Sequence, residues 1–127
     1  MRATAVTVLI AFCLSLALGI FCTRYTHHIA LEYQQQIEDT ALAIQEEQWQ
    51  AALEMTLMLE KAWENHARLL SFFTDHSEVD AVSLGLTLLR VSIEEKERSH
   101  ALFYAAELCQ TLALVRARDA FVLKNIL

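Results

Sequence analysis

Apolar residues recur along most of the chain at spacings of three and four, which is the period of an α-helix. Between about residues 24 and 46 they form one stripe, and acidic and amide residues fill the opposite side. That stripe consists of Ile29, Tyr33, Ile37, Ala41 and Ile44. The same spacing continues over about residues 48–74, 77–94 and 98–124, so the pattern predicts four helices.

The second predicted helix carries both tryptophans on one stripe, which consists of Trp49, Leu53, Thr56, Leu59, Trp63, Leu70 and Phe73. Trp49 and Trp63 are two heptads apart, so we expect them on one face, about 21 Å apart along the helix axis. We interpret both as structural core residues rather than as ligand-stacking residues. Met55, Met58 and Leu69 are expected to widen the stripe, and such an arc predicts contact with more than one neighbouring helix.

The third predicted helix follows a turn, with Ser77 as its expected N-cap and Asp80 returning a hydrogen bond to that cap. Gly85 lowers helix stability by roughly 1 kcal/mol relative to alanine, so we expect a close helix crossing there. The period places Val79, Val82, Leu86, Leu89 and Ile93 inward, and Asp80, Ser83, Thr87, Arg90 and Glu94 outward.

The fourth predicted helix follows the charged run at residues 94–98, and one polar residue interrupts its apolar stripe. The stripe consists of Leu102, Ala105, Leu108, Leu112, Val115 and Val122. Asp119 falls on the same stripe, so we expect it to bond a helix terminus or to pair with Arg116 or another basic residue.

Residues 3–23 contain no charged residue, and 21 helical residues span roughly 30 Å, the thickness of the hydrocarbon core of a bilayer. We interpret residues 1–23 as a transmembrane anchor. A cleaved signal peptide is the alternative, because Ala17-Leu18-Gly19 provides small residues for cleavage. Nothing between Thr23 and His28 breaks a helix, so the anchor and the first amphipathic helix are expected to form one rod.

Composition points to an all-α fold, because the chain has no proline and only two glycines, the main residues that form turns. At 127 residues there is room for one domain, over residues 24–127, after the anchor. Four helices joined by short connections predict an antiparallel array. Arg2 and Arg24 flank the apolar run and acidic residues begin only at Glu32, which slightly favours an extracytoplasmic position for the domain.

All sixteen acidic residues but only nine of the ten basic residues follow the apolar run, which gives residues 24–127 a formal charge of −7. This charge argues against nucleic acid or anionic lipid as a partner, because both need a basic surface. Cys109 is the single cysteine after the run, so the helical domain is expected to have no internal disulfide.

The turn at residues 72–80 is the best candidate for a functional site, because it gathers Asp75, His76, Glu78 and Asp80. Carboxylates and imidazole suit Zn, Mn or Fe. The same residue types are favoured at helix N-termini for capping alone, however. We therefore favour a structural role for this turn and keep a metal or ligand site as the alternative.

Other candidate motifs predict no catalytic residue and no cofactor. Glu97 and His100 have the Glu-x-x-His spacing of di-iron bundles, but such sites need a second pair and two more glutamates. His27 and His28 are interpreted as interfacial polar residues, with a pH-responsive role as the alternative. The sequence shows no nucleophile–base pair, glycine-rich phosphate loop or paired-cysteine motif, so we do not expect an enzyme.

The order of these features resembles a known family of small proteins. The features are the membrane span, Trp49, Trp63, Phe73-Thr74-Asp75-His76-Ser77-Glu78-Val79-Asp80, Leu89, Ile93, Glu107-Leu108 and Asn125-Ile126-Leu127. The chain is similar over nearly its whole length to the bacterial proteins grouped as the domain of unknown function numbered 4363. The resemblance implies a single-span membrane protein of Gram-positive, largely clostridial bacteria, and it implies no activity. Leu114 departs from the family pattern, in which many relatives are expected to carry a histidine.

Two functional hypotheses follow from the sequence. The first is a protein-interaction or structural module, anchored in the cytoplasmic membrane and displayed at the bacterial cell surface, that binds another protein or itself. The alternative is a small-ligand or metal-binding sensor domain that uses the turn from Asp75 to Asp80.

Overall fold

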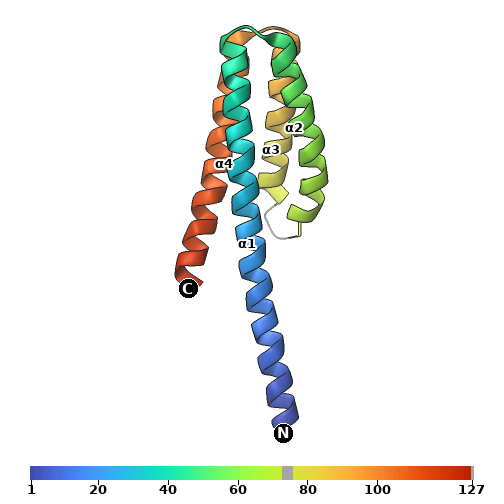
Figure 1. Cartoon of the computed structure of the whole chain (residues 1–127), viewed down its shortest axis with the longest axis vertical. Helices are drawn as coiled ribbons and strands as arrows, with labels where there is room; N and C mark the ends of the chain where they lie inside the picture. Colours follow the sequence, from blue (N-terminus) through green and yellow to red (C-terminus); the bar gives the residue numbers. More distant parts are fainter. Residues whose placement is uncertain (73–75, 127) are drawn as a thin grey trace.

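The computed structural model describes the backbone of residues 1–72 and 76–126, and the side chains of residues 1–72, 76–117 and 124. Four helices make up almost all of it: α1 (Arg2–Gln45), α2 (Trp49–Leu70), α3 (His76–Glu94) and α4 (Arg98–Ile126). No strand occurs among the described residues, so the predicted all-α fold is confirmed. Successive helices run in opposite directions, and the upper part of α1 packs with the other three in a four-helix bundle (Figure 1).

Each helix of the bundle packs against two neighbours, so the order around the bundle is α1, α2, α3, α4 and back to α1. Most of the predicted inward positions are buried, and the core residues Ile37, Ile44 and Leu89 are fully inaccessible to solvent. Two threonines, Thr40 and Thr56, are also fully buried. Their hydroxyls donate to the carbonyl oxygens of Gln36 and Ala52 one turn earlier, which satisfies both hydroxyls within their own helices.

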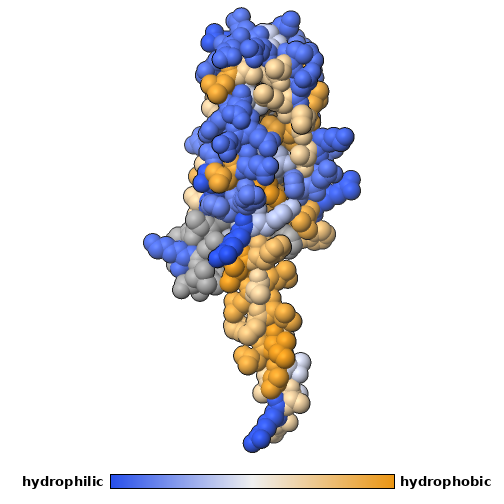
Figure 2. All heavy atoms as spheres, in the orientation of Figure 1, coloured by the Kyte–Doolittle hydropathy of each residue, from blue (hydrophilic) through white to orange (hydrophobic). Residues whose placement is uncertain are grey.

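Helix α1 is one continuous rod of 44 residues, as the absence of a helix breaker predicts. Its residues up to Gly19 are exposed, whereas its buried residues begin at Cys22, where the bundle starts. Figure 2 shows this projecting segment as a largely apolar column below a mostly hydrophilic bundle. Its length and composition make it a candidate membrane span.

Two of the helix connections end the preceding helix in the same way. Glu47 and Lys96 both adopt a left-handed backbone conformation with a φ of 57°. In each connection the next residue donates its backbone N–H to a carbonyl five residues earlier, from Gln48 to Ala43 and from Glu97 to Ser92, both at 2.9 Å. This is the Schellman motif, built here without the glycine that usually occupies the left-handed position.

Three apolar residues of α2 do not join the core as predicted. Met55, Met58 and Leu69 are 39%, 73% and 44% exposed. The core-facing side of α2 is already filled by Ala52, Thr56, Leu59, Trp63 and Leu70. The prediction that α2 contacts more than one neighbouring helix is nevertheless confirmed, because α2 packs against both α1 and α3.

The predicted close crossing at Gly85 is present between α3 and α4. A Cβ atom placed on Gly85 would lie 2.5 Å from Leu108 Cδ2 and 2.9 Å from Leu108 Cγ. Real Cβ contacts are essentially never this short, so a side chain at this position requires the two helices or Leu108 to shift.

We expect Gly85→Val to lower the free energy of unfolding by about 1–3 kcal/mol, because overpacking against Leu108 outweighs any gain in helix propensity. The measurement is thermal or urea unfolding of the detergent-solubilised protein, followed by circular dichroism. The matched control is Ala81→Val, which adds a β-branched residue at an exposed position of the same helix. Equal stability of the two variants would contradict a close crossing.

Candidate functional site

The turn that the sequence singled out does not form a metal site among the described residues. Phe73 and Asp75 lie outside them. Of the remaining candidates, His76 and Asp80 are exposed and Glu78 is half-buried. No three described histidine, cysteine, aspartate or glutamate side chains come together anywhere in a group that could hold a metal ion.

Ser77, the residue predicted as N-cap, lies within helix α3. Helix α3 begins at His76, so Ser77 is the second residue of the helix rather than the residue that precedes it. Glu78 stays in the first turn, where a carboxylate interacts favourably with the positive end of the helix dipole.

The Glu-x-x-His pair lies at the opposite end of the bundle, at the start of α4. His100 Nδ1 and Glu97 Oε2 form a close ion pair with each other, and both side chains are largely exposed. Because each is the partner of the other at the surface, the pair does not project into the bundle core as a di-iron ligand would.

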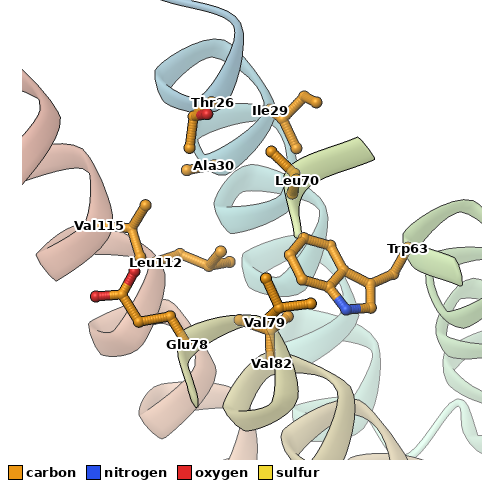
Figure 3. A pocket seen from close by; sticks show the side chains of 10 residues that line it. All are labelled: Thr26, Ile29, Ala30, Trp63, Leu70, Glu78, Val79, Val82, Leu112 and Val115. Carbon is orange, nitrogen blue, oxygen red and sulfur yellow. The ribbon is translucent and has the colours of Figure 1, made fainter. Parts of the chain in front are cut away.

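Ten side chains from all four helices line a small cavity at the end of the bundle nearest the projecting part of α1 (Figure 3). They are Thr26, Ile29, Ala30, Trp63, Leu70, Glu78, Val79, Val82, Leu112 and Val115. The cavity volume is about 20 Å³, which has room for about one water molecule. The walls are apolar apart from Thr26 and Glu78, so the cavity is too small and too apolar to hold a cofactor.

A cluster of aromatic rings ties α1 to α2 beside this cavity. The Tyr33 ring packs edge-on against Trp63, with centroids 5.5 Å apart, and against His66, with centroids 6.0 Å apart. The Tyr25 hydroxyl and His66 Nδ1 are hydrogen-bonded at 3.0 Å. Edge-to-face packing of this kind stabilises the helix interface beyond the burial of apolar area.

Trp63 is buried in the core, as predicted. Its indole N–H bonds to Ser83, which the helical period predicts on the outer side of α3. The indole N–H of Trp63 donates to Ser83 Oγ at 2.8 Å, from α2 to α3. Ser83 Oγ in turn donates to the carbonyl oxygen of Val79 at 3.0 Å. Trp49, on the same face of α2, is half-buried against the core.

We expect Ser83→Ala to lower the free energy of unfolding by about 1–3 kcal/mol, because it leaves a largely buried indole N–H without an acceptor. Chemical unfolding followed by tryptophan fluorescence measures the effect. The control is Thr87→Ala, which removes a hydroxyl that bonds only within α3. A Ser83→Ala variant as stable as this control would show that the hydrogen bond contributes nothing.

The hydroxyl of Tyr33 is buried and has no hydrogen-bond partner among the described residues. Burial raises the pKa of Tyr33 from 10.0 to about 12, with smaller contributions from the charges of Glu32 and Tyr25. The neutral phenol is therefore the form that the folded state favours.

Because the pKa of Tyr33 is raised on folding, its contribution to stability is intact below pH 10 and is lost as the pH rises from 10 to about 12. We expect one tyrosine to ionise near pH 12 in an absorbance titration of the folded protein. Tyr33→Phe should remove this component, whereas Tyr104→Phe should retain it. Persistence of the component in Tyr33→Phe would assign it to another residue.

A polar contact fastens α4 to α1 on the other side of the bundle. Arg116 Nη1 donates to Gln34 Oε1 at 2.8 Å, and the Cys109 thiol lies 3.8 Å from the backbone oxygen of Gln34. Burial, together with the charge of Glu38, raises the pKa of the Cys109 thiol, so it is not an activated nucleophile. Asp119 is predicted to bond a helix terminus or to pair with a basic residue, and its side chain lies outside the described ones.

The two histidines beyond the apolar run differ in their surroundings. His28 is exposed, whereas His27 is half-buried and its Nδ1 atom has no hydrogen-bond partner among the described residues. His27 lies one heptad before Gln34 on α1 and thus on the side of α1 that faces α4.

A groove open to solvent lies between α1 and α2, and we call it the methionine groove. It is lined by Gln36, Asp39 and Thr40 of α1 and by Met55, Met58 and Leu59 of α2. The Thr40 hydroxyl lies 3.8 Å from the Met55 sulfur at its floor. The flexible methionine side chains form one wall and Asp39 contributes a carboxylate to the other, so the groove combines adaptable apolar contact with negative charge.

A match to a family model shows the family of the chain. A model described as Domain of unknown function (DUF4363) matches residues 20–126. The chain belongs to this family. The match begins in the part of α1 that enters the bundle and extends through α4, so it covers the bundle. No match was found among the curated proteins, and none among the solved structures.

Proposed function

We propose that this DUF4363 protein is a membrane-anchored interaction module at the surface of a bacterial cell, in which the helical bundle binds another protein. The projecting apolar half of α1 serves as the single span, and the bundle lies outside the cytoplasm. The flanking residues Arg2 and Arg24 and the late first carboxylate, Glu32, support this orientation.

The methionine groove is the observation that carries the proposal. Met58 is 73% exposed and Met55 is 39% exposed, although both are large apolar side chains next to a well-packed core. Leu59 and Thr40 close the floor of the groove, so a partner would contact a preformed depression. Methionine-lined grooves suit an amphipathic helix, because the thioether side chains adapt to the apolar face that enters.

The acidic residues beside the methionine groove favour a partner that carries positive charge. Asp39 lies in the groove wall, and Glu32 on the same helix is hydrogen-bonded to the groove residue Gln36. A helix with apolar residues on one face and lysine or arginine beside them would match this wall in both apolarity and charge. The acidic excess of residues 24–127 supports attraction of a basic partner over longer distances.

A binding role fits the described residues better than catalysis or metal sensing does. The cavity is about 20 Å³ and almost entirely apolar, and no described cluster of three potential metal ligands supports the sensor alternative at the turn. The methionine groove offers contact area rather than a reactive group.

The test uses affinity-tagged full-length protein in intact membranes, with a photoreactive amino acid in place of Met58. We expect a crosslinked adduct of one defined protein, identified by mass spectrometry. Met55→Glu in the same protein should lower the adduct yield at least about tenfold, the equivalent of ~1.4 kcal/mol, because it places a charge in the apolar contact. An adduct with a second copy would make the interaction self-association.

The matched control carries the photoreactive amino acid in place of Lys61, an exposed residue on the outer side of the same helix. It should give no adduct. Equal yields at the two positions, or a yield unaffected by Met55→Glu, would overturn the groove as the contact surface.

A further inference from the structure

The end of the bundle that lies nearest the projecting half of α1 is close to the boundary of the charge-free run. The cavity in Figure 3 brings Thr26 of α1 to the level of Leu70 of α2 and Val115 of α4. Thr26 follows the last residue of the run, Thr23, by three residues, or about 4.5 Å along the helix. Because α1 is continuous here, this end of the bundle cannot stand clear of a membrane that the run crosses.

The end of α2 presents large apolar side chains at this level. Leu69 is 44% exposed, and Phe72, two residues beyond Leu70, is 81% exposed. On α1, Phe21 is 65% exposed at the same end of the bundle. None of these three side chains is needed to fill the core, which Leu70 and Cys22 close at this point.

Helix α4 extends even further in this direction. Its backbone continues for eleven residues from Val115 to Ile126, about 16 Å, beside the part of α1 that precedes Thr26. Figure 1 shows the end of α4 well below the ends of α2 and α3. The last turns of α4 therefore run beside the charge-free run itself.

The charges of the bundle are unevenly distributed between its two ends. The end remote from the run carries five exposed glutamates, Glu46, Glu47, Glu94, Glu95 and Glu97, together with the exposed cations Lys96 and Arg98. At the end near the run, Arg24, Arg68 and Lys124 are exposed, beside the exposed Asp80 and the half-buried Glu78. The net charge of the chain thus hides two arginines, Arg24 and Arg68, that are positioned next to the expected membrane surface.

We propose that the base surface, made of Leu69 and Phe72 with Arg24 and Arg68, is a second membrane contact that rests in the phospholipid headgroup layer. The inference rests on the proposed anchoring of α1. Phe72 and Leu69 enter the boundary between headgroups and acyl chains, where interfacial helices bury apolar side chains by about 5–10 Å. Arg24 and Arg68 extend their side chains to lipid phosphates, which accept charge-assisted hydrogen bonds from guanidinium groups.

A phospholipid surface fits this end of the bundle better than a protein partner does. The exposed apolar side chains and the arginines lie at the end of the bundle from which the candidate span projects. The contact holds the bundle at a fixed height, so that the acidic end points away from the bilayer.

The experiment places a fluorescent label at Phe72→Cys in the full-length chain, in which Cys13, Cys22 and Cys109 are replaced by alanine. The protein is reconstituted into phosphatidylcholine and phosphatidylglycerol vesicles that contain lipids with a nitroxide quencher near the headgroup. We expect loss of fluorescence at position 72 equal to that of a label at Thr23→Cys. The matched control, Phe103→Cys, is also an exposed phenylalanine position, but near the acidic end, and should not be quenched.

A label at Phe12→Cys, in the middle of the charge-free run, separates the two proposals when the quencher is placed deep in the acyl chains. Quenching at position 12 without quenching at position 72 would overturn the base contact and leave the anchor intact. Absence of quenching at position 12 would overturn the anchor itself and the base contact with it. A photoreactive amino acid at position 72 in the chain with native cysteines should attach to lipid, and attachment to protein instead would also overturn the proposal.

Discussion

The continuity of α1 is the constraint on which the other parts depend. From Arg2 to Gln45 the backbone hydrogen bonds follow one another without a proline, a break or a kinking residue. The upper half of this rod supplies one side of the core through Ile29, Tyr33, Ile37 and Ile44, and both α2 and α4 pack directly on it. Once α1 is fixed, the two Schellman connections determine where α2 and α4 begin, and Gly85 determines how closely α3 approaches α4.

Features that depend on local chemistry could be predicted from the sequence. The absence of breakers predicted the rod, the three-and-four spacing predicted the core stripes, and an isolated glycine in an apolar helix predicted the crossing at Leu108. Periodicity alone could not give the rest, because it describes one helix at a time. Met55 and Met58 have core-like spacing, but their exposure depends on where α1 lies beside α2. Ser83 has surface-like spacing, but the indole N–H of Trp63 requires an acceptor at that position.

The same limit applies to function. The turn is a candidate site because acidic residues and a histidine are adjacent in its sequence. Acidic residues are also favoured in the first turn of a helix such as α3, where they interact with the helix dipole. The methionine groove combines residues from two helices, and no sequence motif marks it. Net charge has the same limit, since a total of −7 over residues 24–127 does not show that Arg24 and Arg68 lie at the end of the bundle opposite the exposed glutamates.

The unbroken helix has a mechanical consequence. With no hinge between the bundle and the projecting segment, a twist or tilt of one is transmitted as the same twist or tilt of the other. A partner that seats beside Met58 would then change the angle at which the apolar column is inclined, some 30 residues of helix away, without any change of fold. Any such tilt would reach the apolar column through α1, the helix that the bundle and the column share.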